Sequence, residues 1–167
     1  MNPIIKLLFL LCTGLAWAAP APAAGIDLHA YWDQRCFQCH GHAGEFARRS
    51  LRVDAGQLQG SHHRKDLERF LRQHYLNDAL VAPVSAMLAA QVTTAPLYSQ
   101  KCASCHGTAA EFTRASLTLR GGVLVGLPSG RRLSDTLAHH GKLTPAEQAL
   151  VVDTLARVLG EVSGAGR

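Results

Sequence analysis

The stretch Cys36-Phe37-Gln38-Cys39-His40 decides the fold, because it returns along the chain as Cys102-Ala103-Ser104-Cys105-His106. The two copies are related by a constant offset of 66 (102 − 36), and this offset aligns further identical residues without a gap. The positions identical in both copies include Cys36, Cys39, His40, Gly41, Ala43, Glu45, Phe46, Arg48, Ser50, Leu51, Gly56, Leu58, Gly60, Leu67, Leu71 and His74. The pattern indicates a tandem duplication of one unit of roughly 65 to 70 residues.

Each copy of the motif has the spacing of a c-type haem attachment site. Two thiols on one helical turn can add to the two vinyl groups of a haem, and the next histidine can bind the iron. We therefore expect two covalently attached haem c groups. The expected attachment thiols and proximal iron ligands are Cys36, Cys39, His40, Cys102, Cys105 and His106. A zinc site or a thioredoxin-like pair needs no histidine directly after its second cysteine.

The same alignment separates the nine histidines of the chain. Beyond the proximal pair, only His74 and His140 are histidine in both copies, and each follows its proximal histidine at the same separation (74 − 40 and 140 − 106). They follow Leu71 and Leu137 by three residues, a spacing that shares one helix face. We expect His74 and His140 to be the distal iron ligands, although a core histidine bonded to a backbone carbonyl has the same pattern.

Methionine is the main alternative distal ligand. Met87 is the only methionine besides the initiator, and it aligns with Asp153, so it could serve the first haem alone. A methionine on an apolar helix face more often serves packing. His62 and His63 lie in a polar stretch and are weaker rivals.

With both motifs in register, the chain resembles the c-type cytochromes, specifically tandem dihaem forms whose domains look like a small class I cytochrome c. The resemblance covers nearly all of the chain beyond its N-terminal leader. It implies an all-α fold of two tandem cytochrome c-like helical domains, each built around a covalent haem. Class I domains commonly use a distal methionine, and two distal histidines would instead give lower reduction potentials.

A second repeated segment, Glu45-Phe46-x-Arg48-x-Ser50-Leu51, recurs at residues 111–117. Phe46 and its counterpart Phe112 suit packing against a haem edge. Arg48 and its counterpart Arg114 suit charge-assisted hydrogen bonds to haem propionates. An exposed arginine beside a carboxylate at helical distance is the equally simple alternative.

The N-terminus has the features of a secretory signal peptide, with Lys6, an apolar stretch from Ile4 to Trp17 and a small residue on each side of Trp17. The stretch is short for a membrane span, so we expect no stable span after cleavage and a location in the periplasm. The expected organisation is a signal peptide (1–18), a flexible leader (19–26), a first cytochrome c domain (27–91), a linker (92–95) and a second cytochrome c domain (96–167).

Helical spacing predicts short helices at 28–36 and 96–102 that lead into the motifs, and second helices at 65–75 and 132–140. Glycine-rich irregular chain is expected between them, with no strands. A last helix should begin at the capping box Thr144 to Glu147, and Pro83 should delay its counterpart in the first copy.

The formal net charge of +5 permits a local basic face, but export argues against a nucleic-acid partner. The leading hypothesis is an electron carrier, rather than an enzyme, that passes single electrons between redox partner proteins. The alternatives are a dihaem redox enzyme with one open haem, such as a peroxidase or a small-molecule oxidoreductase, and a ligand-binding haem sensor.

Overall fold

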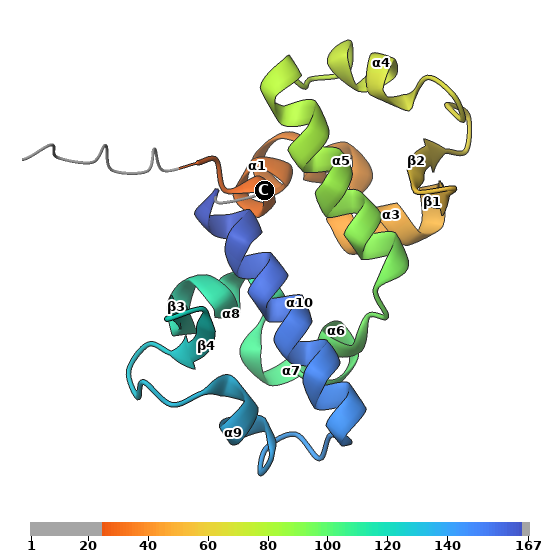
Figure 1. Ribbon diagram of the computed structural model, residues 1–167. Helices are drawn as coiled ribbons and strands as arrows, with labels where there is room; N and C mark the ends of the chain where they lie inside the picture. The colour runs from red at the N-terminus through yellow and green to blue at the C-terminus, as the bar shows by residue number, and fades with distance from the viewer. Residues whose placement is uncertain (1–24, 165–167) are drawn as a thin grey trace, which may run out of the picture.

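The computed structural model describes residues 25–164, which form ten α-helices and two small antiparallel sheets (Figure 1). The expected signal peptide and most of the expected leader lie outside the described residues. A mainly helical fold is confirmed, and the two small sheets are an addition to the all-α fold that was expected. None of the helices within the described range is long and apolar enough to cross a membrane.

The chain runs through the same order of elements twice. The first half, residues 25–93, contains α1 (Leu28–Arg35), α2 (Phe37–His40), α3 (Ala43–Ser50), β1 (Leu51–Asp54), β2 (Gln57–Gly60), α4 (Leu67–Arg72) and α5 (Asp78–Thr93). The second half, residues 97–164, contains α6 (Leu97–Lys101), α7 (Ala103–His106), α8 (Ala109–Ser116), β3 (Leu117–Arg120), β4 (Val123–Gly126), α9 (Leu133–Leu137) and α10 (Pro145–Ser163). The bounds of α2, α3, β1 and β2 recur in α7, α8, β3 and β4 at the offset that relates the two motifs.

The two glycine-rich segments form β-hairpins where irregular chain was expected. Leu51 pairs with Gly60 across β1 and β2, and Leu117 pairs with Gly126 across β3 and β4. Both hairpins have two-residue loops at positive φ, with 47° and 76° at residues 55 and 56, and 57° and 78° at residues 121 and 122. A tight hairpin turn of this kind needs positive φ at both central positions, which glycine supplies most easily. Four-residue strands are too short for their alternation to stand out in the sequence.

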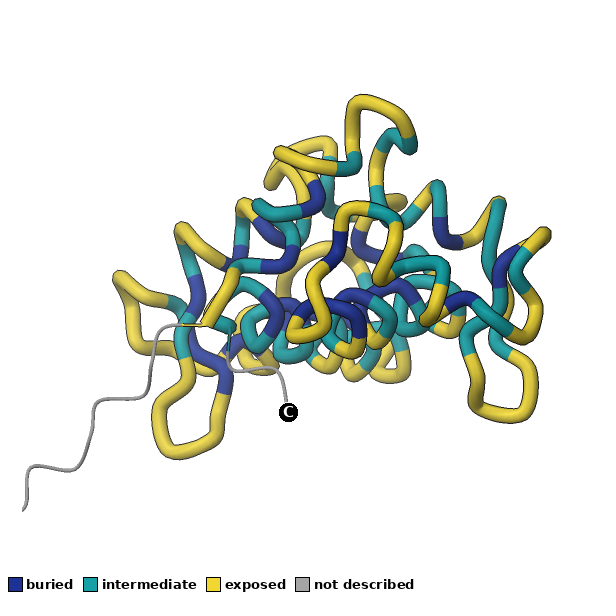
Figure 2. The backbone as a smooth tube through the Cα atoms, turned by 90° about the horizontal axis from the view of Figure 1, so that it is seen from above, coloured by how far each residue is buried: buried dark blue, intermediate teal, exposed yellow. Residues whose placement is uncertain are grey.

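Each half has its own hydrophobic core. In the first half α1 and α5 supply most of the buried side chains, namely Leu28, Trp32, Leu80, Val81, Val84, Met87 and Leu88, together with Ala47 and Leu76. In the second half the buried cluster is Leu97, Tyr98, Leu117, Leu124, Leu133, Leu137, Val151 and Leu155. Figure 2 shows buried segments along the middle of the molecule and exposed loops projecting from it. The two cores are separate clusters, as expected for two repeated units.

The long helix of the first half differs from the expectation. α5 begins at Asp78, although Pro83 was expected to delay its start. The Asn77 side chain caps the helix by accepting a hydrogen bond from the Leu80 N–H at 3.1 Å. Capping and the burial of Leu80, Val81 and Val84 offset the roughly 3 kcal/mol that an interior proline costs. At its other end α5 runs to Thr93, so the expected linker starts inside the helix.

The two halves meet through equivalent faces. A pocket of about 290 Å³ between them is lined by residues that the repeat offset relates to one another. These repeat-related pairs include Trp32 and Tyr98, His42 and Thr108, Ala43 and Ala109, and Gln91 and Arg157. In an isologous dimer the same face of each subunit forms the interface. The two halves of this chain are therefore related by approximate two-fold symmetry.

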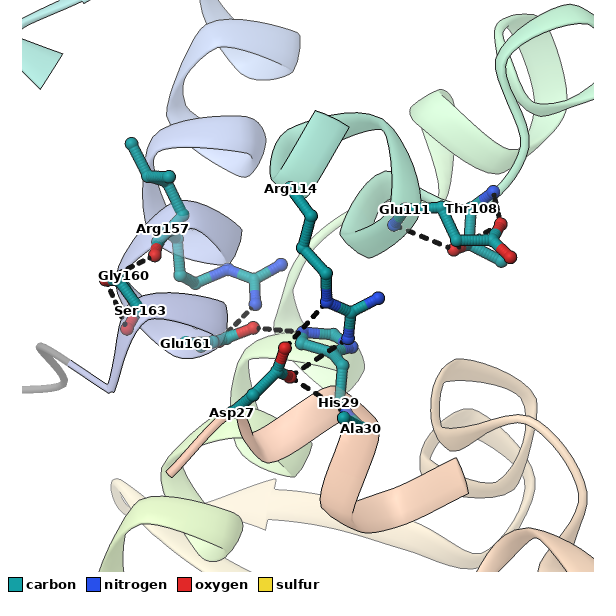
Figure 3. A network of polar contacts seen from close by, with 11 residues as sticks. Asp27, His29, Ala30, Thr108, Glu111, Arg114, Arg157, Gly160, Glu161 and Ser163 are labelled. Carbon is teal, nitrogen blue, oxygen red and sulfur yellow. Dashed lines mark hydrogen bonds and ion pairs between the residues drawn. The ribbon is translucent and has the colours of Figure 1, made fainter. Parts of the chain in front are cut away.

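Ion pairs between α1 and the second half hold this interface together (Figure 3). Arg114 donates two hydrogen bonds to the Asp27 carboxylate, at 2.6 and 3.0 Å. His29 Nε2 lies 2.7 Å from Glu161, which also accepts from Arg157 and is only 8% exposed. Burial works to raise the pKa of Asp27, but its hydrogen bonds from Arg114 and the Ala30 N–H leave that pKa below the ordinary value. Removing one partner would leave a partly buried charge unpaired.

The predicted capping box at the start of α10 is confirmed, and it leads to a prediction about pH. The Glu147 carboxylate accepts hydrogen bonds from Lys101 at 2.6 Å and from the Thr144 N–H at 2.8 Å, which lower its pKa from 4.5 to about 2. A carboxyl group whose pKa is lower in the folded than in the unfolded state stabilises the fold at pH values above its unfolded pKa. This stabilisation is lost as the pH falls through the folded-state pKa. Glu147→Gln should therefore lower the free energy of unfolding at pH 7.

The difference in the free energy of unfolding between the unsubstituted protein and Glu147→Gln should shrink as pH falls from 4.5 to about 2. Urea unfolding at a series of pH values measures it. Lys101→Met is the matched control and should remove much of the same pH dependence, because Lys101 is the strongest of the groups that lower this pKa. A difference in the free energy of unfolding that stays constant between pH 7 and pH 2 would contradict this role of the ionised Glu147 carboxylate.

Candidate functional site

The two motifs occupy equivalent positions on α2 and α7. Cys36 and Cys102 precede these helices and are half-buried, whereas Cys39 and Cys105 are exposed, and all four are free thiols. Burial raises the pKa of the Cys36 and Cys102 thiols. Each half therefore presents two unpaired cysteines three residues apart, directly before a histidine.

Each motif histidine faces the second histidine that the alignment selected. The ring centroids of His40 and His74 are 5.9 Å apart with the rings inclined at 67°, and those of His106 and His140 are 5.8 Å apart at the same inclination. Two imidazoles that bind one ion from opposite sides need roughly 6 Å, because each metal–nitrogen bond takes about 2 Å and each ring about 1 Å more. Both pairs have this spacing.

The histidine pairs fit a metal that brings further ligands of its own. Within residues 25–164, no group of three or more histidine, cysteine, aspartate or glutamate side chains is placed to hold a bare ion. Two imidazoles alone are too few for a closed protein site, which typically has four ligands. A haem provides four nitrogens in its plane and takes two axial ligands from the protein. The pairs therefore suit the axial positions of a haem.

In the first half the histidines open into a cavity of about 530 Å³, within the size range of cofactor sites. Cys36, Cys39, His40 and His74 all line it. Most of its wall is apolar, with Trp32, Phe46, Leu67, Phe70, Val84 and Leu88 among the lining residues. The cavity thus combines attachment thiols, paired imidazoles and an apolar wall, which together suit a large flat apolar group.

Aromatic rings hold the proximal histidines in place. Phe46 meets His40 edge-on at 4.5 Å, and Phe112 meets His106 in the same way at 4.9 Å. Both phenylalanines were expected at a haem edge, and both lie against the motif histidine.

Burial, with smaller contributions from His74 and Arg49, lowers the pKa of His40. The neutral imidazole, the form that binds metals, is therefore favoured.

The distal histidines lie just beyond the helices that were expected to carry them. α4 ends at Arg72 and α9 at Leu137, so His74 and His140 lie in the following turn. The His74 N–H donates to the Leu71 carbonyl at 3.0 Å, and the His140 N–H to the Leu137 carbonyl at 3.3 Å. Such three-residue hydrogen bonds tighten the end of a helix. The expected helix bounds are corrected, while the expected histidine pairs are brought together.

The repeated arginines have protein partners outside the cavity. Arg114 binds Asp27 across the interface between the halves, and Arg48 donates to the Gln91 carbonyl at 3.3 Å. Arg48 lines the pocket between the halves, and is not among the residues around the 530 Å³ cavity.

Arg35 does line that cavity. It aligns with Lys101, and a basic residue before each motif was the signal that could have identified it.

The alternative distal ligands of the first half differ in position. Met87 is 1% exposed within the core cluster and is not among the residues that line the cavity. His62 and His63 do line the cavity. His63 stacks on Phe70 at 4.0 Å, whereas the ring that faces His40 is that of His74. The geometry favours His74 over these three residues.

Comparisons of the chain with protein families, with curated proteins and with solved structures find no match.

Proposed function

We propose that this protein is a dihaem c-type cytochrome that carries single electrons between redox partners. In this proposal each half holds one covalent haem. Cys36 and Cys39 attach the first and Cys102 and Cys105 the second, while the facing histidine pairs bind the two irons. The observation that carries the proposal is that both pairs, 5.9 and 5.8 Å apart, lie beside a Cys-x-x-Cys pair.

A haem held in this way would supply a centre that gains and loses a single electron. The chain's own residues would hold that centre, since each half supplies a pair of facing imidazoles for one metal. Phe46 and Phe112 fix the proximal rings, so little rearrangement accompanies a change of charge. The apolar wall around His40 and His74 limits the entry of water. Two imidazole ligands favour a lower reduction potential than a histidine and a methionine.

The periplasm is the proposed location, because the expected signal peptide and covalent haem attachment both require export. Partner proteins would donate and accept the electrons. A second candidate function, a dihaem redox enzyme with one open haem, draws support from a difference between the halves. His140 is exposed, whereas His74 is only partly exposed.

The first prediction from the proposed function concerns haem loading. When the full chain is produced with a cytochrome c maturation system, the mass of the mature protein should exceed that of the polypeptide by two haems under denaturing conditions. The reason is that thioether bonds survive unfolding and acid–acetone extraction. The variant with Cys102→Ala and Cys105→Ala is the control and should retain one haem. Loss of all haem on extraction would contradict covalent attachment.

A second prediction concerns the distal ligands. His140→Ala should make the second haem high-spin and readily open to carbon monoxide while the first stays low-spin, and His74→Ala should do the converse. Visible and electron paramagnetic resonance spectra measure this. His139→Ala is the control and should change little, because only His140 faces His106. If His139→Ala opened the second haem and His140→Ala did not, the proposed ligand would be wrong.

A third prediction separates His74 from Met87. The oxidised protein should lack the weak far-red charge-transfer band of methionine-ligated haem, because Met87 does not line the cavity. Met87→Leu should keep the visible spectrum and cost at most about 1.5 kcal/mol of stability in urea unfolding, as a near-isosteric core exchange. A far-red band that vanishes in Met87→Leu would instead assign methionine to the first iron.

A further inference from the structure

The distal histidine of the first half is held by a stack of rings. Phe70 lies against His74, with centroids 4.7 Å apart and planes inclined by 21°, and His63 in turn lies against Phe70 at 4.0 Å and 15°. His63 Nδ1 is 3.3 Å from an Asp66 carboxylate oxygen, which anchors the end of the stack. Aromatic pairs of this kind contribute beyond their buried area. Any outward rotation of His74 has to break its contact with Phe70.

The backbone after His74 is also anchored. The Tyr31 hydroxyl donates a hydrogen bond of 2.7 Å to the Tyr75 carbonyl, which ties this turn to α1. The next residue, Leu76, is 7% exposed and belongs to the core cluster of the first half. The segment that carries His74 is therefore fixed through both its side chains and its backbone.

The second half lacks each of these restraints. In the repeat alignment, Phe70 is replaced by Thr136, His63 by Ser129, Tyr31 by Leu97 and Leu76 by Lys142. His140 is exposed, and within residues 25–164 the one aromatic ring in contact with it is that of His106. Gly141 and Lys142 follow, both at positive φ (81° and 50°), with Lys142 exposed. Leu143 packs against the core of the second half and its carbonyl accepts a hydrogen bond from Gln148, but residues 140–142 before it are all exposed. An exposed stretch without buried side chains is the condition for local opening.

We propose that His140 is an exchangeable ligand, and that the second half binds a small diatomic lone-pair donor such as carbon monoxide or nitric oxide. This rests on the proposed function. In the loaded protein His140 would turn into solvent and give up its one bond to the metal, and the incoming molecule would form one bond in its place, with no change in oxidation state and no proton transferred. A diatomic molecule needs only the one coordination position that His140 would vacate. His74, held by its stack, stays bound.

The test adds carbon monoxide to the reduced full-length protein, after its two haems have been verified by mass. The visible spectrum should shift for one of the two haems. His140→Ala should give the same final amplitude at a faster rate, because no imidazole has to leave. This comparison assigns the reacting haem to the second half.

Residues exchanged between the repeats provide matched variants. Ser129→His with Thr136→Phe gives the second half the rings of the first, and should slow the binding of carbon monoxide about two- to tenfold, the range expected from one aromatic pair. His63→Ser with Phe70→Thr should let the first haem bind carbon monoxide as well. An unchanged rate in the first of these variants would overturn the role of the rings.

Equal reaction at both haems, reaction at the first alone or reaction at neither would overturn the proposal. A mature protein without two haems by mass would overturn the proposed function instead. Amide hydrogen exchange on the unsubstituted protein gives a readout that needs no variant to fold. The N–H groups of His74 and His140 make matching hydrogen bonds, so faster exchange at residues 140–142 than at 74–76 supports local opening, and the reverse order contradicts it.

Discussion

The separation of two imidazole rings is the constraint on which each half of this protein depends. The motif histidine lies at the end of a short helix, and the second histidine lies two helices and a hairpin further along the chain. In both halves the two rings are close, with centroids 5.9 and 5.8 Å apart. The intervening chain is α3, a tight hairpin and α4 in the first half, with equivalent elements in the second. The hairpin reverses the chain over few residues, so the turn after α4 returns to the motif. Packing of the surrounding core keeps that return in register.

The size of the first half gives a physical reason for the apolar surface that faces its histidines. A unit of about 70 residues buries too little surface to be comfortably stable on side-chain packing alone. In the first half Trp32, Phe46 and Leu88 line a cavity of about 530 Å³. A large apolar group bound there would add the burial that these side chains lack among themselves. Binding of the group and folding of the unit would then be coupled.

The histidine pairs could be predicted from sequence because a gapless repeat keeps equivalent residues in equivalent places. His74 and His140 were selected from the histidines on this basis, and the structure places both opposite their motif histidines. The hairpins could not be predicted in this way, since four-residue strands next to glycines have too little periodicity. The partner of Arg114 also could not be predicted from the sequence. Asp27 belongs to the other half of the chain, and only the packing of one half on the other brings it close.

The repeats retain the proximal side of each site and differ on the distal side. Phe46 and Phe112 contact their motif histidines at similar distances and inclinations, so both irons would have the same proximal environment. Phe70 and His63, which restrain His74, have no aromatic counterpart beside His140. In the proposed dihaem protein, a difference confined to the second histidine would change how easily that ligand leaves and would preserve attachment through the motif. A ring stack present in only one of two repeated units would therefore be sufficient, in the proposed dihaem protein, to give one closed and one exchangeable site within a single chain.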